Sequence, residues 1–215
     1  MLNTPQQTKS RNWDTLAWHI HHVICADNKI VAEYLTKLLA YWVQNPEKFG
    51  EVAIVLRGEK GLGKSVLAKV LQSWFPNSFM HITQPTQLTN YFNSELASAT
   101  LVFADEIMWK GHKQGESALK ALTIEKPIQI NPKGRDSFLI PNRLKMLIAA
   151  NRSWTVPINE GSPCYLVLDV NKARMGDREY FDKLYEAIDN GEATAMLDNL
   201  LQYDLSTFTP RSLLL

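Results

Sequence analysis

The stretch EVAIVLRGEKGLGKSV, residues 51–66, decides the fold class of this chain. EVAIVL is a short apolar run rich in β-branched residues, which is typical of a buried strand. Gly58, Gly63, Lys64 and Ser65 follow it at the spacing G-x-x-x-x-G-K-[ST] of a phosphate-binding loop. The next segment, KSVLAKVLQSWF, has apolar residues at helical spacing. The order strand, loop, helix therefore predicts a nucleotide site, and a chance glycine-rich turn is the alternative.

The chemistry of this loop follows from its residue types. Glycine adopts backbone angles that other residues resist, so successive N–H groups can turn inward around a phosphate. We expect Lys64 to reach the β- and γ-phosphates of ATP, Ser65 to hold Mg²⁺, and the following helix to direct its positive dipole end at the anion. The predicted nucleotide-binding residues are Gly58, Glu59, Lys60, Gly61, Leu62, Gly63, Lys64, Ser65 and Val66.

Length and composition limit the classes of protein to consider. The chain has 215 residues, 45% of them hydrophobic, which suffices for one α/β core with a small helical appendage. A net charge of +1 provides no overall field toward nucleic acid or membrane, so such binding requires a local patch. No apolar run approaches the roughly 20 residues of a membrane span, and the N-terminus lacks a signal-peptide apolar region. We expect no membrane partner and a cytoplasmic location.

Apolar periodicity divides the chain into four parts. Residues 1–12 are polar, and we expect a flexible tail there. Residues 13–48 predict a helical N-terminal lobe, residues 49–170 the nucleotide-binding core, and residues 171–215 a C-terminal helical segment. Strands separated by helices imply a mainly parallel sheet with helices on both faces, so the predicted fold is a three-layer α/β sandwich.

The core is expected to alternate between strands and helices. A hairpin is predicted from the alternating residues of KPIQINPKGRDSFLIP, and a helix is predicted after Pro85 over PTQLTNYFNSELASA. The expected strands cover residues 52–56, 79–82, 100–107, 144–151 and 164–170.

The run HIHH at residues 19–22 is a possible metal ligand set. No matching cluster of Cys, Asp or Glu stands beside it in the sequence, and the two cysteines of the chain, Cys25 and Cys164, make neither a zinc cluster nor a disulfide framework. We therefore expect a helix whose histidines divide between the surface and an interface, without metal.

Polar residues follow two further predicted strands. Asp105 and Glu106 end TLVFADEI, and Asn151 ends LKMLIAAN. Ligands of open parallel sheets bind at the carboxyl ends of the strands, and phosphoryl transfer requires groups for Mg²⁺ and for the attacking water. We expect Asp105 and Ser65 to hold Mg²⁺ and Glu106, Lys64 and Asn151 to act in catalysis, with Glu106 on the water. A solvated acidic pair at a strand end is the alternative.

Four motifs together resemble those of superfamily-3 helicases, the AAA+ ring ATPases of viruses, phages and plasmids. GEKGLGKS, LVFADEI, LKALTIEKPIQINPKGRDSF and IAANRSW are similar to motifs A, B, B′ and C of that family. The likeness is greatest to the helicase part of phage and plasmid primase-helicase proteins, and it extends over most of the chain. It implies a P-loop NTPase core of the AAA+ type, assembly as a homo-oligomer in a hexameric ring, and a primase domain or protein as partner.

The resemblance also implies a site for single-stranded DNA. In such helicases a hairpin before the Asn strand projects into the ring channel, and the matching segment is residues 128–138, with Lys133 and Arg135 at its tip. Two cations on a glycine-containing turn suit salt-sensitive contacts with phosphates. Without the resemblance, an ordinary solvated turn is the simpler interpretation.

The sequence departs from the family just before the last core strand. The resemblance implies an arginine there that reaches the γ-phosphate of the neighbouring subunit, and such a finger supplies about 10³–10⁵ in turnover. SPC, residues 162–164, carries no charge. Arg152 is the candidate beside Asn151, and Arg174 and Arg178 are other possible substitutes.

Three hypotheses follow for the function. The first is an ATP-dependent DNA helicase or translocase module that moves along single-stranded DNA. The second is an ATP-binding assembly or replication-partner protein of the same fold with weak or lost hydrolysis, because the arginine is absent. The third is a small-molecule P-loop kinase, which is disfavoured because the sequence has no arginine-rich lid and because its strand-end residues suit a ring ATPase better.

Overall fold

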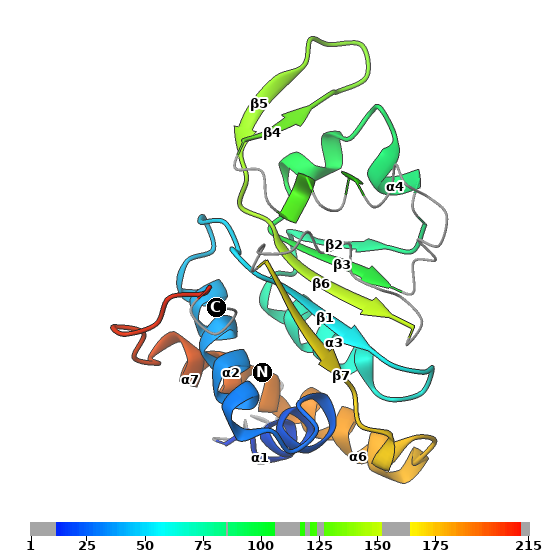
Figure 1. Ribbon diagram of the computed structural model, residues 1–215, viewed down its shortest axis with the longest axis vertical. Coiled ribbons are helices and arrows are strands. Elements are labelled where there is room, and N and C mark those ends of the chain that lie inside the picture. The colour runs from blue at the N-terminus through cyan, green and yellow to red at the C-terminus, as the bar shows by residue number, and fades with distance from the viewer. Residues whose placement is uncertain are drawn as a thin grey trace, which may run out of the picture.

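A computed structural model describes the chain over residues 12–84, 86–105, 117–118, 121–123, 127–151 and 164–211. The fold is built on a five-stranded sheet, and a two-stranded hairpin projects from one end of the molecule (Figure 1). The strands are β1 (Ala53–Arg57), β2 (Phe79–Ile82), β3 (Leu101–Asp105), β4 (Pro127–Ile130), β5 (Phe138–Pro141), β6 (Lys145–Ala150) and β7 (Tyr165–Asp169).

The large sheet is parallel throughout its described strands. Its order is β2-β3-β6-β1-β7, and each neighbouring pair runs in the same direction. β1, β3 and β6 are almost wholly buried, as expected of apolar strands with both faces covered. The antiparallel hairpin β4-β5 forms the second sheet. The predicted strands and hairpin are therefore confirmed, with ends that differ by a few residues.

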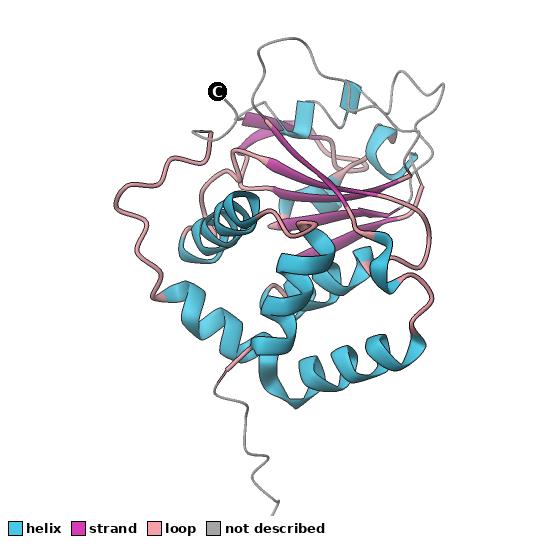
Figure 2. Cartoon of the chain, turned by 60° about the horizontal axis from the view of Figure 1, so that its bottom comes forward, coloured by secondary structure: helices cyan, strands magenta, loops and turns pink. Residues whose placement is uncertain are grey.

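Most of the helices gather on one face of the sheet (Figure 2). The described helices are α1 (Asp14–Trp18), the π-helix η1 (His19–Ile24), α2 (Lys29–Gln44), α3 (Lys64–Trp74), α4 (Thr86–Thr89), the 3-10 helices η2 (Ser94–Ala97) and η3 (Lys172–Arg174), α6 (Arg178–Ala187), the π-helix η4 (Ile188–Glu192) and α7 (Ala193–Leu201). In the described ranges, none of these helices combines the length and the apolar character that crossing a membrane requires.

Alternate residues along the strands point to opposite faces of the sheet and belong to two separate hydrophobic clusters. On one face Leu56, Phe103 and Leu147 pack with the buried side chains of α2, α3 and α7. On the other face Val55 and its neighbours meet Ile128 of the hairpin, together with buried residues of η2 and residues 121–123. Helices cover the first face as predicted, but shorter elements cover the second within the described ranges.

The helix predicted after Pro85 is wrong as a single element. Only α4 and the short η2 form, and the chain between them is irregular. The side chain of Asn93 accepts a hydrogen bond from the Asn131 N–H at 2.7 Å and donates to the Gln129 carbonyl at 2.9 Å. These bonds to the hairpin compete with local helical bonds, so tertiary contacts override helix propensity here.

The N-terminal lobe is helical with one break. Residues 25–28 separate η1 from α2, and the Asn28 side chain caps α2 by accepting from the Val31 N–H at 3.2 Å. The lobe is joined to β6 by Lys145, which is fully buried. Its ammonium donates to the carbonyls of Asn45, Pro46 and Lys48 at 2.7–3.0 Å.

Candidate functional site

The carboxyl ends of three strands lie side by side at one edge of the sheet. β6 lies between β1 and β3, with Arg57 opposite Ala150 and Asp105 opposite Ala149. The N–H of Gly58 donates to the Ala150 carbonyl at 3.0 Å, which ties the loop after β1 to the end of β6. The sheet order therefore brings together the three strand ends on which the sequence prediction depends.

The loop between β1 and α3 encloses a cation. Gly61 and Gly63 have φ values of +85° and +86°, the left-handed region that favours glycine. The Lys64 ammonium donates to the carbonyls of Gly58 and Glu59, both at 2.7 Å, and the side chain is 6% exposed. The loop thus holds a buried positive charge at the N-terminus of α3, where the helix dipole also favours an anion.

A pocket of about 450 Å³ opens beside this loop. Its volume and its mixture of apolar and charged walls are typical of sites for small molecules. It joins the loop to the end of β3 and to one side of α6. The lining residues are Lys60, Gly61, Leu62, Gly63, Lys64, Ser65, Asp105, Phe181 and Tyr185. Ser65 and Asp105, the two predicted Mg²⁺ ligands, therefore line one pocket.

Two aromatic side chains of this pocket were missed by the sequence interpretation. Phe181 and Tyr185 are four residues apart on α6 and so lie on the same side of the helix. The Lys69 ammonium lies 4.9 Å from the centroid of the Tyr185 ring. Aromatic residues at this spacing in YFDKLY are the available signal, but such spacing alone predicts only the apolar side of a helix.

His19 supports the loop from the N-terminal lobe. Its side chain is 1% exposed, and Nδ1 lies 2.8 Å from the Tyr180 hydroxyl. A Cβ added to Gly63 would lie 2.9 Å from Cε1 of His19 and 2.7 Å from Cε1 of Phe181. Burial lowers the pKa of His19 to about 4, partly offset by a hydrogen bond with the Gly63 backbone. A neutral imidazole thus packs against the loop at neutral pH.

The remaining predicted site residues are catalytic residues, a metal ligand and a candidate arginine finger. Asn151 follows β6 and is exposed, but it is not among the described residues that line the pocket. Asp105 also approaches His81, with Oδ2 at 3.6 Å from Nε2. Glu106 and Arg152 lie outside the described residues.

Two of the three candidate arginine fingers, Arg174 and Arg178, lie among the described residues. The Arg174 guanidinium donates to the Asp177 carboxylate at 2.8 Å and lies 5.1 Å from the Trp18 ring centroid and 4.9 Å from the Tyr180 ring centroid. The Arg174 side chain is therefore held by residues of this chain. Arg178 is exposed at the first position of α6.

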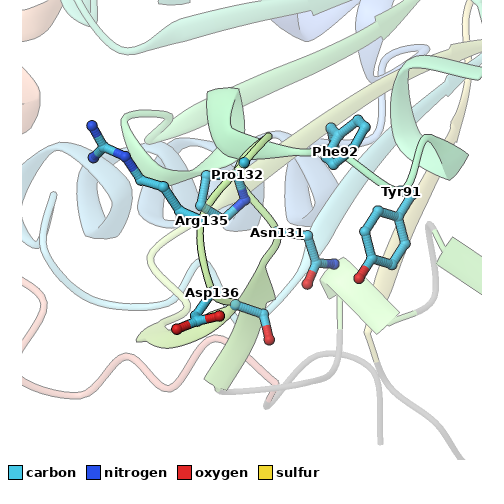
Figure 3. Close-up of a pocket in the computed structure, with 8 residues that line it drawn as sticks. Tyr91, Phe92, Asn131, Pro132, Arg135 and Asp136 are labelled. Atoms are coloured by element: carbon cyan, nitrogen blue, oxygen red, sulfur yellow. The ribbon is translucent and has the colours of Figure 1, made fainter.

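A second concave site lies at the hairpin. Lys133 and Arg135 are exposed on its turn, where Gly134 has a φ of +74°. The turn lines a pocket of about 270 Å³ together with Tyr91 and Phe92, which are 73% and 49% exposed. Figure 3 shows Arg135 extending away from these two rings. Adjacent aromatic residues in the polar stretch TNYFNS were a signal that the sequence interpretation did not use.

The fold and the loop pocket define an α/β protein with a mainly parallel sheet. The chain belongs to a family of unknown function, DUF5906, whose sequence profile matches residues 56–163. A comparison with curated proteins gives no match.

Solved structures show the same fold. Two apo structures of the NrS-1 C-terminal region match with TM-scores of 0.77 at 19% and 18% identity, and each alignment covers 96% of this chain. A structure of JCV helicase with a bound substituted acetamide matches with a TM-score of 0.54 at 12% identity, covering 96% of this chain and 58% of that one. The chain spans about half of the NrS-1 structures, 51% and 50% of their lengths.

Proposed function

We propose that this chain is an ATP-dependent DNA helicase or translocase module that hydrolyses ATP to move along single-stranded DNA. The observation that carries the proposal is the pocket lined both by Lys64 and Ser65, at the start of α3, and by Asp105, at the end of β3. This arrangement supplies the three parts that a bound Mg-nucleotide requires: backbone N–H groups with a cation, a hydroxyl, and a carboxylate. The likeness in fold to JCV helicase is consistent with it.

Each residue then has a definite role. The triphosphate of ATP binds on residues 58–66, and Lys64 exchanges its bonds to the Gly58 and Glu59 carbonyls for the β- and γ-phosphates. Ser65 and Asp105 hold Mg²⁺. Glu106 orients and deprotonates the attacking water, and Asn151 contacts the γ-phosphate or that water. Phe181 and Tyr185 provide an apolar wall for the base, because the flat faces of aromatic rings stack on planar groups.

The hairpin pocket is the proposed DNA contact. Lys133 and Arg135 neutralise phosphates, and the exposed rings of Tyr91 and Phe92 stack on bases. A hexameric ring gathers this turn from every subunit into one channel, so a chain with a net charge of +1 acquires a local basic surface. A primase domain or protein is the proposed partner, and the proposed location is the cytoplasm of a bacterial or phage-infected host cell.

A second candidate is an ATP-binding assembly protein with weak or lost hydrolysis. The observation that favours it is that Arg174, one of the candidate arginine fingers, is engaged with Asp177 and two aromatic rings of its own subunit. Cys164, in the segment where the family resemblance implies an arginine, is buried. Arg152 is then the candidate finger of an active enzyme.

The test is an equilibrium ATP titration followed by ATPase measurements with and without single-stranded DNA, run beside a mass measurement of the oligomer. Lys64→Ala should abolish tight ATP binding, whereas the control Lys183→Ala, whose ammonium is exposed and pairs with Glu179, should retain it. DNA-stimulated turnover supports the helicase. Tight ATP binding without turnover supports the second candidate, and a Lys64→Ala variant with unchanged affinity refutes both.

The hairpin has its own test. Lys133→Ala with Arg135→Ala should weaken DNA binding and flatten its dependence on salt, because fewer counterions are released. ATP affinity should not change, since the two side chains lie outside the nucleotide pocket. An unchanged salt slope excludes the hairpin as the DNA contact.

A further inference from the structure

Three potential metal ligands converge between η1 and α2, and none of them lines the nucleotide pocket. Nδ1 of His22 contacts Oδ1 of Asp27, and Nδ1 of His21 lies 3.9 Å from the same oxygen. One ligand atom from each of the three side chains lies within 4.8 Å of the others. We propose that His21, His22 and Asp27 bind a zinc ion.

The backbone brings these residues together although they are five and six positions apart. His21 and His22 are neighbours in the π-helix, and their ring centroids are 4.6 Å apart. After the helix, Ala26 and Asp27 adopt φ values of +48° and +66°, a left-handed pair without glycine. The Asp27 N–H donates to the His21 carbonyl at 3.0 Å, which closes the turn and returns Asp27 to the histidines.

This turn is unfavourable by itself. A non-glycine residue in the left-handed region costs free energy, and two in succession persist only where the surroundings hold them. Strained backbone of this kind is found preferentially at functional sites. The sequence analysis expected no matching cluster of Cys, Asp or Glu beside HIHH, and this expectation is corrected because the turn brings Asp27 to the histidines.

The chemical types of the three ligands favour zinc over Mg²⁺ and Ca²⁺. Two imidazoles and one carboxylate are typical zinc ligands, whereas Mg²⁺ and Ca²⁺ require oxygen donors. Metal-bound imidazole is uncharged, so this donor set would bring one negative charge, that of the carboxylate, to a divalent cation. The side chains of His21, His22 and Asp27 are 29%, 38% and 60% exposed, so they can rotate to the shorter spacing that a tetrahedral ion needs. The fourth ligand position stays open to water.

One of the ligands packs against a neighbouring aromatic ring. The ring of Trp18 lies against His22, with centroids 4.6 Å apart. Zinc would cross-link the two ends of the turn and fix η1, the same helix that holds His19 against Gly63. The proposed site does not depend on the function proposed above, since none of its ligands lines the nucleotide pocket.

The experiment is a calorimetric titration of zinc into the untagged, metal-free chain. We expect one ion per chain and a weakening of zinc affinity by more than about tenfold for His21→Ala, His22→Ala and Asp27→Asn. Asp27→Asn is the sharpest of these variants, because Asn tolerates the left-handed backbone and removes only the carboxylate. The control is His81→Ala, which removes a histidine paired with a single aspartate, Asp105, and should bind zinc normally.

Thermal unfolding gives a second measurement that does not depend on calorimetric heats. Zinc should raise the melting temperature of the unaltered chain and of His81→Ala, and should raise it less in the three ligand variants, because a ligand that binds the folded state stabilises it. Three results overturn the proposal: no zinc uptake by the unaltered chain, equal affinity in Asp27→Asn, or loss of binding in His81→Ala.

Discussion

His19 makes the stability of this protein sensitive to acid. The imidazole is almost completely buried between Tyr180 and the Gly63 turn, and burial lowers its pKa to about 4 from 6.5. In the unfolded chain the imidazole binds a proton as soon as the pH falls below its ordinary value. Between these two pKa values the unfolded state therefore binds more protons, and the free energy of unfolding decreases as the pH falls.

The size of the effect follows from the two values. Between about pH 7.5 and about pH 4.5, a shift from 6.5 to about 4 removes about 2.5 kcal/mol of stability. The contribution is complete above pH 6.5 and is lost as the pH approaches 4. A typical domain has only about 5–15 kcal/mol in total, so this one residue should dominate the early part of acid unfolding.

The assay is urea unfolding of the unaltered chain and of His19→Gln at a series of pH values. Glutamine keeps a polar amide near Tyr180 and Gly63 but does not titrate. The stability difference between the two proteins should shrink by about 2.5 kcal/mol on acidification, while contributions from all other groups cancel. Parallel pH profiles for the two proteins would refute the assignment of a neutral, buried imidazole at the loop.

Three further predictions concern other described or predicted positions. Lys145→Met should lower the free energy of unfolding by about 3 kcal/mol in urea titrations, because four partly buried backbone carbonyls lose their donor. Burial also lowers the Lys145 pKa to about 8, so only the unfolded lysine keeps its proton between 8 and 10.5, and the stability difference between the unaltered chain and Lys145→Met should widen by about 2 kcal/mol from about pH 7 to about pH 9.5. Gly63→Ala should reduce both stability and ATP affinity, measured by thermal unfolding and titration, because the glycine has a φ of +86° and an added Cβ meets two rings. Glu106→Gln should trap ATP without turnover, and unchanged steady-state hydrolysis would remove Glu106 from its role.

The sequence predicted the parts of the fold that depend on local pattern. Each buried strand appeared as an apolar run, and the hairpin at residues 128–138 appeared as alternation around a turn. The helix after Pro85 failed because Asn93 bonds to the hairpin, a segment more than thirty residues away that no local pattern reports. Phe181 and Tyr185 were not predicted as pocket residues for a similar reason. Helical spacing indicates which side of a helix is apolar, but it does not indicate which other segment that side faces.

The candidate site was predictable to the extent that strand order could be inferred. Gly58, Asp105 and Asn151 were expected at one edge because parallel strands end together. Only the sheet order, with β6 between β1 and β3, makes their strands neighbours. His19 lay beyond prediction, because nothing in HIHH indicates which of its histidines packs on a turn forty residues later.

β6 offers the most direct link between the hairpin and the nucleotide pocket. It follows the hairpin after three residues, and the carbonyl of its last residue, Ala150, accepts from Gly58 of the loop. The connection is rigid: Asn142 donates to the Leu122 carbonyl and accepts from the Leu144 N–H, both at 2.9 Å, and Lys145 is held by carbonyls of the lobe. Such a fixed base does not allow the hairpin to swing freely about the sheet. Under the proposed function, ATP must therefore move DNA by changing how whole subunits sit against one another, and the tip of the hairpin follows its subunit.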